Sequence, residues 1–364
     1  PEVDAALGTG SYGDIVEAVQ RALEGNSGLA YFAPQDSGCL TGKRHLLTPD
    51  YTAYLRIAEG CNNRCSYCVI PFIRGRFRSV PMEDLIAEAK ELVAGGAKEL
   101  LVIAQDITRY GLDLYGKYAL ADLLRKFSEE TNIPWIRLLY CYPDKITDEL
   151  VAEMRDNPRI LKYIDLPLQH VSDHMLSAMN RHGDGKTVRG VVEKLRREIP
   201  EIVIRTTFIV GFPGETEEDF VELCEFVKEA KFDHAGVFTY SREEGTPAYN
   251  FDGQIDEQVK QDRYDILMQT QLTVAEEIGL FGAAAFDFAS LEELSADFMT
   301  TVPGSYVKDL KPVALYFYID TTSVRNGEEM DRVWLNSKST YTYSMFPYTE
   351  LAINESSKDA PLLN

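Results

Sequence analysis

Three cysteines stand close together in this chain, at Cys61, Cys65 and Cys68, with the spacing C-x3-C-x2-C. Three thiolates on one loop can bind three corners of a 4Fe-4S cluster, whereas a cluster that only transfers electrons normally takes four cysteines. The fourth iron would then be free to bind the amino and carboxylate groups of S-adenosylmethionine (SAM). One electron would cleave the bound sulfonium to methionine and a 5'-deoxyadenosyl radical. The motif therefore predicts a cluster that takes part in chemistry.

Two other interpretations of these cysteines require different neighbours. A structural zinc site normally has a fourth Cys or His at regular spacing, and the local sequence offers none. Three unrelated buried thiols would need apolar surroundings, whereas this loop is rich in Asn and Arg. Simple packing is the interpretation of the remaining cysteines, Cys39, Cys141 and Cys224.

Histidines and arginines offer weaker candidates. His170 and His174 recur four residues apart, which could place both on one helix face as a metal pair, but no Glu or third ligand accompanies them. Three arginines follow the cysteine loop in an otherwise acidic chain. They are either solvated surface charges or groups that hold an acidic target side chain: Arg74, Arg76 and Arg78.

Alternating strands and helices must position these groups. From residue 51 to residue 240, short β-rich runs alternate with amphipathic helical segments, which is typical of parallel βα units. Right-handed crossovers place the helices outside and leave the carboxyl ends of the strands to form the site. The predicted strands cover residues 54–57, 99–104, 135–140, 163–166, 203–210 and 235–240.

Several helices are predicted from the same patterns. One covers residues 82–93 after Pro81, and another covers 216–230, where Thr216 and Asp219 resemble a capping box. The apolar face of the second helix is expected to carry Phe220, Leu223, Cys224 and Val227. A helix at 13–23 precedes a linker, and β-rich runs follow at 313–318 and 340–345, with a frayed end from 354.

The predicted fold class is α/β, a partial (β/α)6 barrel with additions at both ends. The barrel is assigned to residues 46–254 and an N-terminal remnant with its linker to 1–45, so the chain is expected to begin within a domain. A connecting helix follows at 255–278, and a small β-rich C-terminal module at 279–364.

Composition and charge limit the classes of function. The chain has 364 residues, 37 basic and 58 acidic side chains and a formal charge of -21. Such a field repels phosphate backbones and attracts basic partners, so nucleic acid is a disfavoured substrate. No apolar stretch reaches the roughly 18 residues of a membrane span, and no secretory signal is visible. With six cysteines, too few for a disulfide scaffold, a cytoplasmic location is expected.

Residues 59–68 resemble the radical SAM superfamily, and further segments narrow the resemblance to methylthiotransferases of the RimO type. These segments are IPFIRG (70–75), QDITRYG (105–111), YCYPD (140–144), LPLQH (166–170) and GFPGET (211–216). The resemblance extends from about residue 1 to residue 271. It implies a radical SAM barrel, with a 4Fe-4S cluster and SAM as cofactors.

The resemblance also implies a reaction and its partners. The family methylthiolates an aspartate of a basic small-subunit ribosomal protein, with hydrogen abstracted from the β-carbon and an electron donor required. Its sulfur comes from a second 4Fe-4S cluster, held by cysteines of an N-terminal domain. Only the tail end of that domain is expected here, so the ligands of the second cluster are absent. The family's C-terminal TRAM domain does not align with the β-rich tail.

Roles for single residues follow from the resemblance. Tyr67 would lie near the adenine, Gln105 and Gln169 at strand ends would face SAM, and Arg205 would pair with the SAM carboxylate. Backbone at Gly211 and Gly214 could approach the ligand closely. From the residues alone, the arginine could equally form an ion pair with a neighbouring acid, and the glutamines could be satisfied interior amides. The glycines fit an ordinary strand-to-helix turn better.

Two alternatives to aspartate methylthiolation stay open. The first is a methylthiotransferase of the tRNA-modifying type, with the same chemistry on an adenosine. The second is an incomplete chain that keeps the cluster and binds a ribosomal partner without catalysis.

Overall fold

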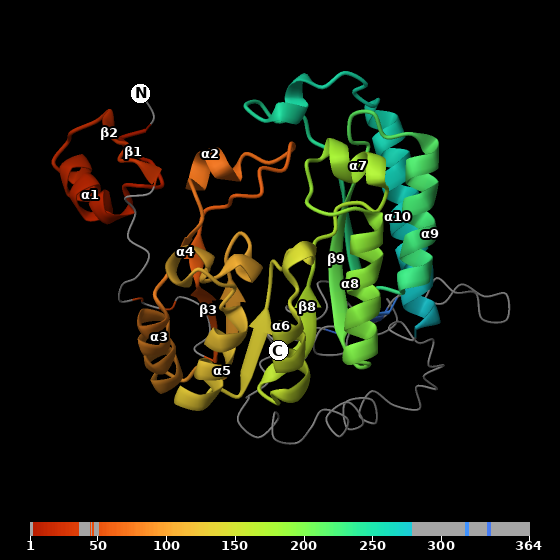
Figure 1. The fold of residues 1–364 in the computed structure, drawn as a ribbon. Helices are drawn as coiled ribbons and strands as arrows, with labels where there is room; N and C mark the ends of the chain where they lie inside the picture. Colours follow the sequence, from red (N-terminus) through yellow and green to blue (C-terminus); the bar gives the residue numbers. More distant parts are fainter. Residues whose placement is uncertain are drawn as a thin grey trace. The chain divides into compact units, whose positions relative to one another are not determined.

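The computed structural model describes residues 3–35, 44, 46 and 51–278, together with short strands at 317–319 and 333–335 (Figure 1). The chain divides into two units, Pro1–Ala283 and Ala284–Asn364. The predicted domain boundaries at residues 45, 254 and 278 stay a prediction. Among the described residues, no helix combines the length and apolarity that crossing a bilayer requires.

A six-stranded parallel sheet forms the centre of the first unit. Its strands lie side by side in chain order, as in an open barrel, so the predicted α/β partial barrel is confirmed. The strands are β3 (Thr52–Arg56), β6 (Glu99–Ile103), β7 (Trp135–Leu138), β8 (Ile160–Asp165), β9 (Val203–Val210) and β10 (His234–Thr239).

Three predicted strand limits were wrong by more than a residue. β3 begins at Thr52, two residues before the predicted start. β7 ends at Leu138 instead of Tyr140, because Tyr140 has a φ of 61° and leaves the extended conformation. β8 begins at Ile160, three residues before the predicted start, and Ile160 pairs with Ile136 of β7.

Helices flank the strands, as Figure 1 shows, and bury an apolar core against one face of the sheet. Along β9, Ile204, Phe208 and Val210 are fully buried, whereas Arg205 between them is exposed. Burying each such large apolar side chain contributes roughly 1.5–3 kcal/mol. The main helices are α3 (Met82–Ala94), α5 (Leu120–Glu130), α6 (Asp148–Asp156), α8 (Gly185–Glu198), α9 (Glu217–Ala230) and α10 (Glu257–Glu277).

The start of α9 confirms the predicted capping box. The Thr216 side chain accepts a bond from the Asp219 amide, and the Asp219 side chain accepts from the Thr216 amide. Phe220 and Leu223 are buried as predicted, while Cys224 is only partly buried at the edge of the core.

Short elements complete the described residues. In the N-terminal part, α1 (Ile15–Leu23) starts two residues later than predicted, and β1 (Ala5–Leu7) and β2 (Leu29–Tyr31) form a parallel pair that the prediction missed. In the second unit, β11 (Phe317–Ile319) pairs with β12 (Val333–Leu335), and β11 overlaps the predicted run at 313–318. The predicted run at 340–345 and the end from 354 lie outside the described residues. The loops carry β4 (Ala58–Glu59), β5 (Arg78–Ser79), α2 (Ile70–Arg74), α4 (Leu112–Tyr115) and α7 (Asp173–Ala178).

Candidate active site

The cysteine loop leaves the barrel directly after β4 and returns through β5. These two short strands pair antiparallel and close the base of the loop. Gly60 begins the turn with a φ of 82°, and a Cβ there would lie 2.2 Å from the carbonyl oxygen of Arg76. Only glycine fits this position, so the sequence fixes the direction in which the cysteines leave the strand.

A buried hydrogen-bonded pair of side chains, Asn63 and Asp106, anchors the cysteine loop. The Asn63 amide donates to Asp106 Oδ2 at 2.9 Å, and Asp106 Oδ1 accepts from the Thr108 backbone amide at 3.1 Å. Both Asn63 and Asp106 are buried. Sequence reasoning treated the asparagines only as a sign of an exposed loop and missed this contact, because its partners lie 43 residues apart.

The three thiols of the loop are partly or fully buried in the cluster-free protein. Cys65 is buried, and Cys61 and Cys68 are half-buried. Burial raises the pKa of Cys61 to about 11 and also raises that of Cys68, and the neighbouring thiols add to both shifts. Binding of a cluster must therefore displace protons from these thiols.

Each thiolate that binds a cubane cluster contacts a different iron, so its ligands need not converge on one point. In the parts of the chain that the structure describes, no three His, Cys, Asp or Glu side chains converge tightly enough for a single ion. Cluster binding by the three cysteines of this loop stays a prediction.

Gln105 and Gln169 lie beyond the carboxyl ends of β6 and β8, as predicted. Gln169 has a φ of 72°, and its backbone pairs with β9 through Thr207 and Ile209. The side-chain oxygens of both glutamines are buried and have no hydrogen-bond partner in the structure. A buried acceptor left unpaired costs about 1–3 kcal/mol. The two oxygens are thus available to donors of a bound ligand.

Arg205 lies near the amino end of β9 and forms an ion pair with a neighbouring acid. Its Nη1 donates to Asp165 Oδ1 at 2.9 Å, and the arginine side chain is 49% exposed. Asp165 is buried, and its other oxygen accepts from the backbone amide of Tyr140 at 3.0 Å. Pairing of Arg205 with the SAM carboxylate stays a prediction.

Tyr67 and the two glycines have protein neighbours in the structure. The Tyr67 ring meets Phe212 edge-to-face, with 6.5 Å between ring centroids. A Cβ on Gly211 would lie 2.2 Å from Lys260 Cγ, whereas around Gly214 there is open space. Packing against α10 and a positive φ explain Gly211, as expected for a strand-to-helix turn.

The family of this chain follows from comparison with known proteins. Residues 55–227 match the model of the Radical SAM superfamily. The chain therefore contains a radical SAM domain. A relative from Desulforamulus reducens named ribosomal protein uS12 methylthiotransferase RimO is 53% identical over 281 residues, which are 76% of this chain and 62% of that protein. The protein of the same name from Clostridium botulinum is 50% identical over 279 residues, 76% of this chain and 63% of its own length.

The predicted resemblance to RimO-type methylthiotransferases is therefore confirmed, and a 4Fe-4S cluster and SAM are the cofactors of this superfamily. The chain spans less than two thirds of the length of these relatives. Among solved structures, the radical SAM methyltransferase TsrM from Kitasatospora setae has a TM-score of 0.46 at 19% identity, covering 54% of this chain and 38% of that one.

The histidines of this radical SAM domain do not form the metal pair that their spacing allowed. His170 precedes α7 and lies buried beside Glu215, with 3.3 Å between His170 Nε2 and Glu215 Oε1. His174 is on α7 and pairs with Asp219 at 2.8 Å. The two rings are thus engaged by different carboxylates.

The arginines after the cysteine loop differ from one another. Arg74 Nη1 lies 3.0 Å from the Tyr12 hydroxyl and 3.6 Å from Glu59. Arg78 has two buried nitrogens, Nε and Nη1, with no hydrogen-bond partner in the structure. Arg76 is exposed.

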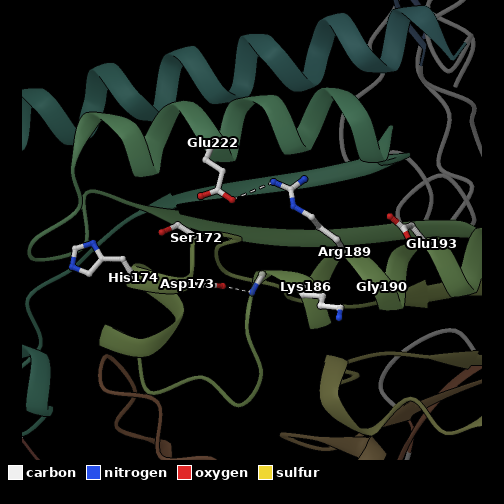
Figure 2. Close-up of a pocket in the computed structure, with 9 residues that line it drawn as sticks. Ser172, Asp173, His174, Lys186, Arg189, Gly190, Glu193 and Glu222 are labelled. Carbon is white, nitrogen blue, oxygen red and sulfur yellow. Dashed lines mark hydrogen bonds and ion pairs between the residues drawn. The ribbon is translucent and has the colours of Figure 1, made fainter.

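A surface hollow of about 650 Å³ lies between α7, α8 and α9 (Figure 2). One ion pair joins two of its lining side chains. Arg189 bonds Glu222 at 3.3 Å and also reaches Glu229 at 2.8 Å, and Asp173 accepts from the Gly185 amide at 2.7 Å. The cysteine loop with its flanking glutamines is the candidate active site, because it brings three thiols together with two buried, unpaired acceptors.

Proposed function

We propose that this chain is a radical SAM methylthiotransferase that modifies an aspartate of ribosomal protein uS12. The observation that carries the proposal is 53% identity over 281 residues with a protein of that name, in a chain that keeps the three-cysteine loop. Because the chain spans 62% of that relative, the complete reaction is a proposal for this chain.

The chain's own side chains have distinct tasks in this proposal. Cys61, Cys65 and Cys68 hold the 4Fe-4S cluster, and the Asn63–Asp106 pair fixes the loop beneath them. The cluster with bound SAM supplies a one-electron cleavage that yields a carbon radical able to abstract hydrogen. The free oxygens of Gln105 and Gln169 accept hydrogen bonds from SAM.

The other cofactor contacts are proposed from the resemblance. Tyr67 contacts the adenine, Arg205 exchanges its present partner Asp165 for the SAM carboxylate, and the loop from Gly211 to Gly214 lies against the ligand. An electron donor reduces the cluster. The second cluster, which supplies sulfur in the family, would take its ligands from outside the residues described.

Recognition of the target is proposed to depend on the net charge of the whole chain and on the arginines after the cysteine loop. The formal charge of -21 attracts a basic ribosomal protein and disfavours tRNA, which argues against the tRNA-modifying alternative. The arginines after the cysteine loop, Arg74, Arg76 and Arg78, are the proposed contacts for the target carboxylate. A ribosomal substrate also places the protein in the cytoplasm.

The test begins with anaerobic reconstitution, iron counting and an assay for 5'-deoxyadenosine after addition of SAM and dithionite. About four irons with deoxyadenosine formed would support the radical SAM activity, and about eight would reveal a second cluster. Mass spectrometry of added uS12 then looks for one methylthio group on an aspartate.

The other outcomes point to the alternatives. Modification of tRNA in place of uS12 would favour the adenosine-modifying type. Binding of uS12 without SAM cleavage would favour a non-catalytic cluster protein and contradict the proposal.

A further inference from the structure

One arginine that sequence reasoning did not single out contacts the cysteine loop directly. Arg181 Nη1 lies 3.9 Å from Cys65 Sγ and 3.4 Å from the Tyr67 hydroxyl, across more than a hundred residues of sequence. Its Nη2 donates to the Pro167 carbonyl at 2.7 Å, and its guanidinium carbon lies 4.2 Å from the centre of the Tyr142 ring. The guanidinium is therefore held on three sides.

The backbone before Arg181 is itself bonded to the cysteine loop. The Asn180 side chain donates to the Arg64 carbonyl at 2.8 Å, and the Ser66 amide donates to the Met179 carbonyl at 2.9 Å. Arg64 and Asn180 both adopt positive φ angles, 53° and 52°. These bonds hold the two segments side by side, while the guanidinium itself is fixed by its own contacts with the Pro167 carbonyl and the Tyr142 ring.

The charge of Arg181 has no carboxylate partner among the described residues. Arg205 is neutralised by Asp165 and Arg74 lies beside Glu59, but the ion pairs of the described part of the chain include none with Arg181. The nearest group that would carry negative charge is the thiolate of Cys65 in a loaded cluster.

We propose that Arg181 is a positioning residue that raises the reduction potential of the cluster on Cys61, Cys65 and Cys68. This inference rests on the proposed cluster site. Hydrogen bonds to the sulfurs and local charge set the potential of an iron-sulfur cluster. Reduction adds one negative charge, and a fixed guanidinium at Cys65 stabilises the reduced state more than the oxidised state. Removal of this charge makes the cluster harder to reduce.

The test compares three variants of the whole chain after anaerobic reconstitution, with potentials read by redox titration followed by electron paramagnetic resonance. Arg181→Met is expected to shift the reduction equilibrium about tenfold toward the oxidised state, which is about 59 mV for one electron. Arg181→Lys keeps the charge and is expected to restore more than half of that shift. Asn180→Ala removes the bond to the Arg64 carbonyl without a change in charge, so its potential should equal that of the unchanged protein.

The outcomes separate this inference from the proposed function. An unchanged protein that takes up no iron would contradict the proposed cluster, and the inference with it. Full iron in all proteins with equal potentials in Arg181→Met and the unchanged protein would overturn the inference alone. So would an equal shift in Asn180→Ala, because it would show that anchoring of the loop, not charge, sets the potential. If Arg181→Met holds no iron, Arg181→Gln keeps a donor for the Pro167 carbonyl and is expected to show the same shift.

Discussion

The cysteine loop and the hollow between α7, α8 and α9 are two polar regions of the same domain with opposite local chemistry. The hollow of about 650 Å³ is lined by exposed or partly exposed charges, among them the ion pair of Arg189 with Glu222. Around the cysteine loop, acceptors such as the side-chain oxygens of Gln105 and Gln169 are buried and unpaired. The comparison teaches that unsatisfied groups held in fixed positions mark a site better than volume does.

The largest expected effect is loss of the cluster from a single thiol. Cys65→Ala should reduce bound iron after reconstitution to background, because the loop offers only three cysteine ligands and the cluster needs all of them. Iron analysis and the visible absorption band measure this. Cys224→Ala is the matched control, since Cys224 lies on α9 at the edge of the core, and it should keep full iron. Full iron in Cys65→Ala would contradict the assignment of the site.

The thiols of the loop should also react slowly before a cluster is bound. A pKa of about 11 leaves Cys61 mostly protonated at pH 8, whereas an ordinary thiol has a pKa near 8.5. Alkylation of Cys61 by iodoacetamide in the iron-free protein should therefore be about a hundredfold slower than that of a free cysteine. The rate should rise about tenfold per pH unit as the pH increases toward 11, as measured by peptide mass spectrometry. A rate that levels off above about pH 9 would show an ordinary thiol.

Replacement of an unpaired glutamine should weaken ligand binding without lowering the free energy of unfolding. Gln169→Leu removes a buried acceptor that has no protein partner, so unfolding free energy should not fall, while SAM binding should weaken about tenfold through loss of one hydrogen bond. Equilibrium dialysis of SAM and denaturant titration measure the two quantities.

Gln254→Leu is the control for this comparison. The Gln254 side chain donates to the carbonyls of Ala248 and Phe251, so its loss should cost stability, with SAM binding unchanged. SAM binding of equal strength in Gln169→Leu and the unchanged protein would remove the glutamine from the proposed site.

The smallest effect is expected in the hollow. Glu222→Gln breaks a partly exposed ion pair with Arg189, and such pairs contribute about 0–1 kcal/mol. Iron content, SAM binding and deoxyadenosine formation should all stay within twofold of the unchanged protein. A large loss of SAM binding in Glu222→Gln would show that the hollow contributes to the SAM site.

Local patterns in the sequence predicted the parts of the fold that local physics determines. The six strands follow from short runs of apolar, β-branched and aromatic residues, and the start of α9 follows from the Thr216–Asp219 capping box. The cysteine spacing is likewise local. The pair β1 and β2 escaped prediction because three-residue strands have too little pattern to stand out.

The contacts that complete the site could not be predicted in the same way. Asp165 holds both Arg205 and the backbone of Tyr140, and the arginine at position 181 reaches Cys65 across 116 residues. No spacing rule connects such residues, because only the folded barrel brings them together. The sequence therefore predicted which residues bind the cluster better than it predicted what surrounds them.

The contacts that anchor the two sides of the cysteine loop are expected to form at different times during folding. The bond from the Phe77 amide to Asn62 closes over 15 residues, whereas the bond from Asn180 to the Arg64 carbonyl needs 116 residues to be in place. Because the entropy cost of closure grows with separation, the near side is expected to fold first. In that interval the thiols belong to a loop that is anchored on one side only.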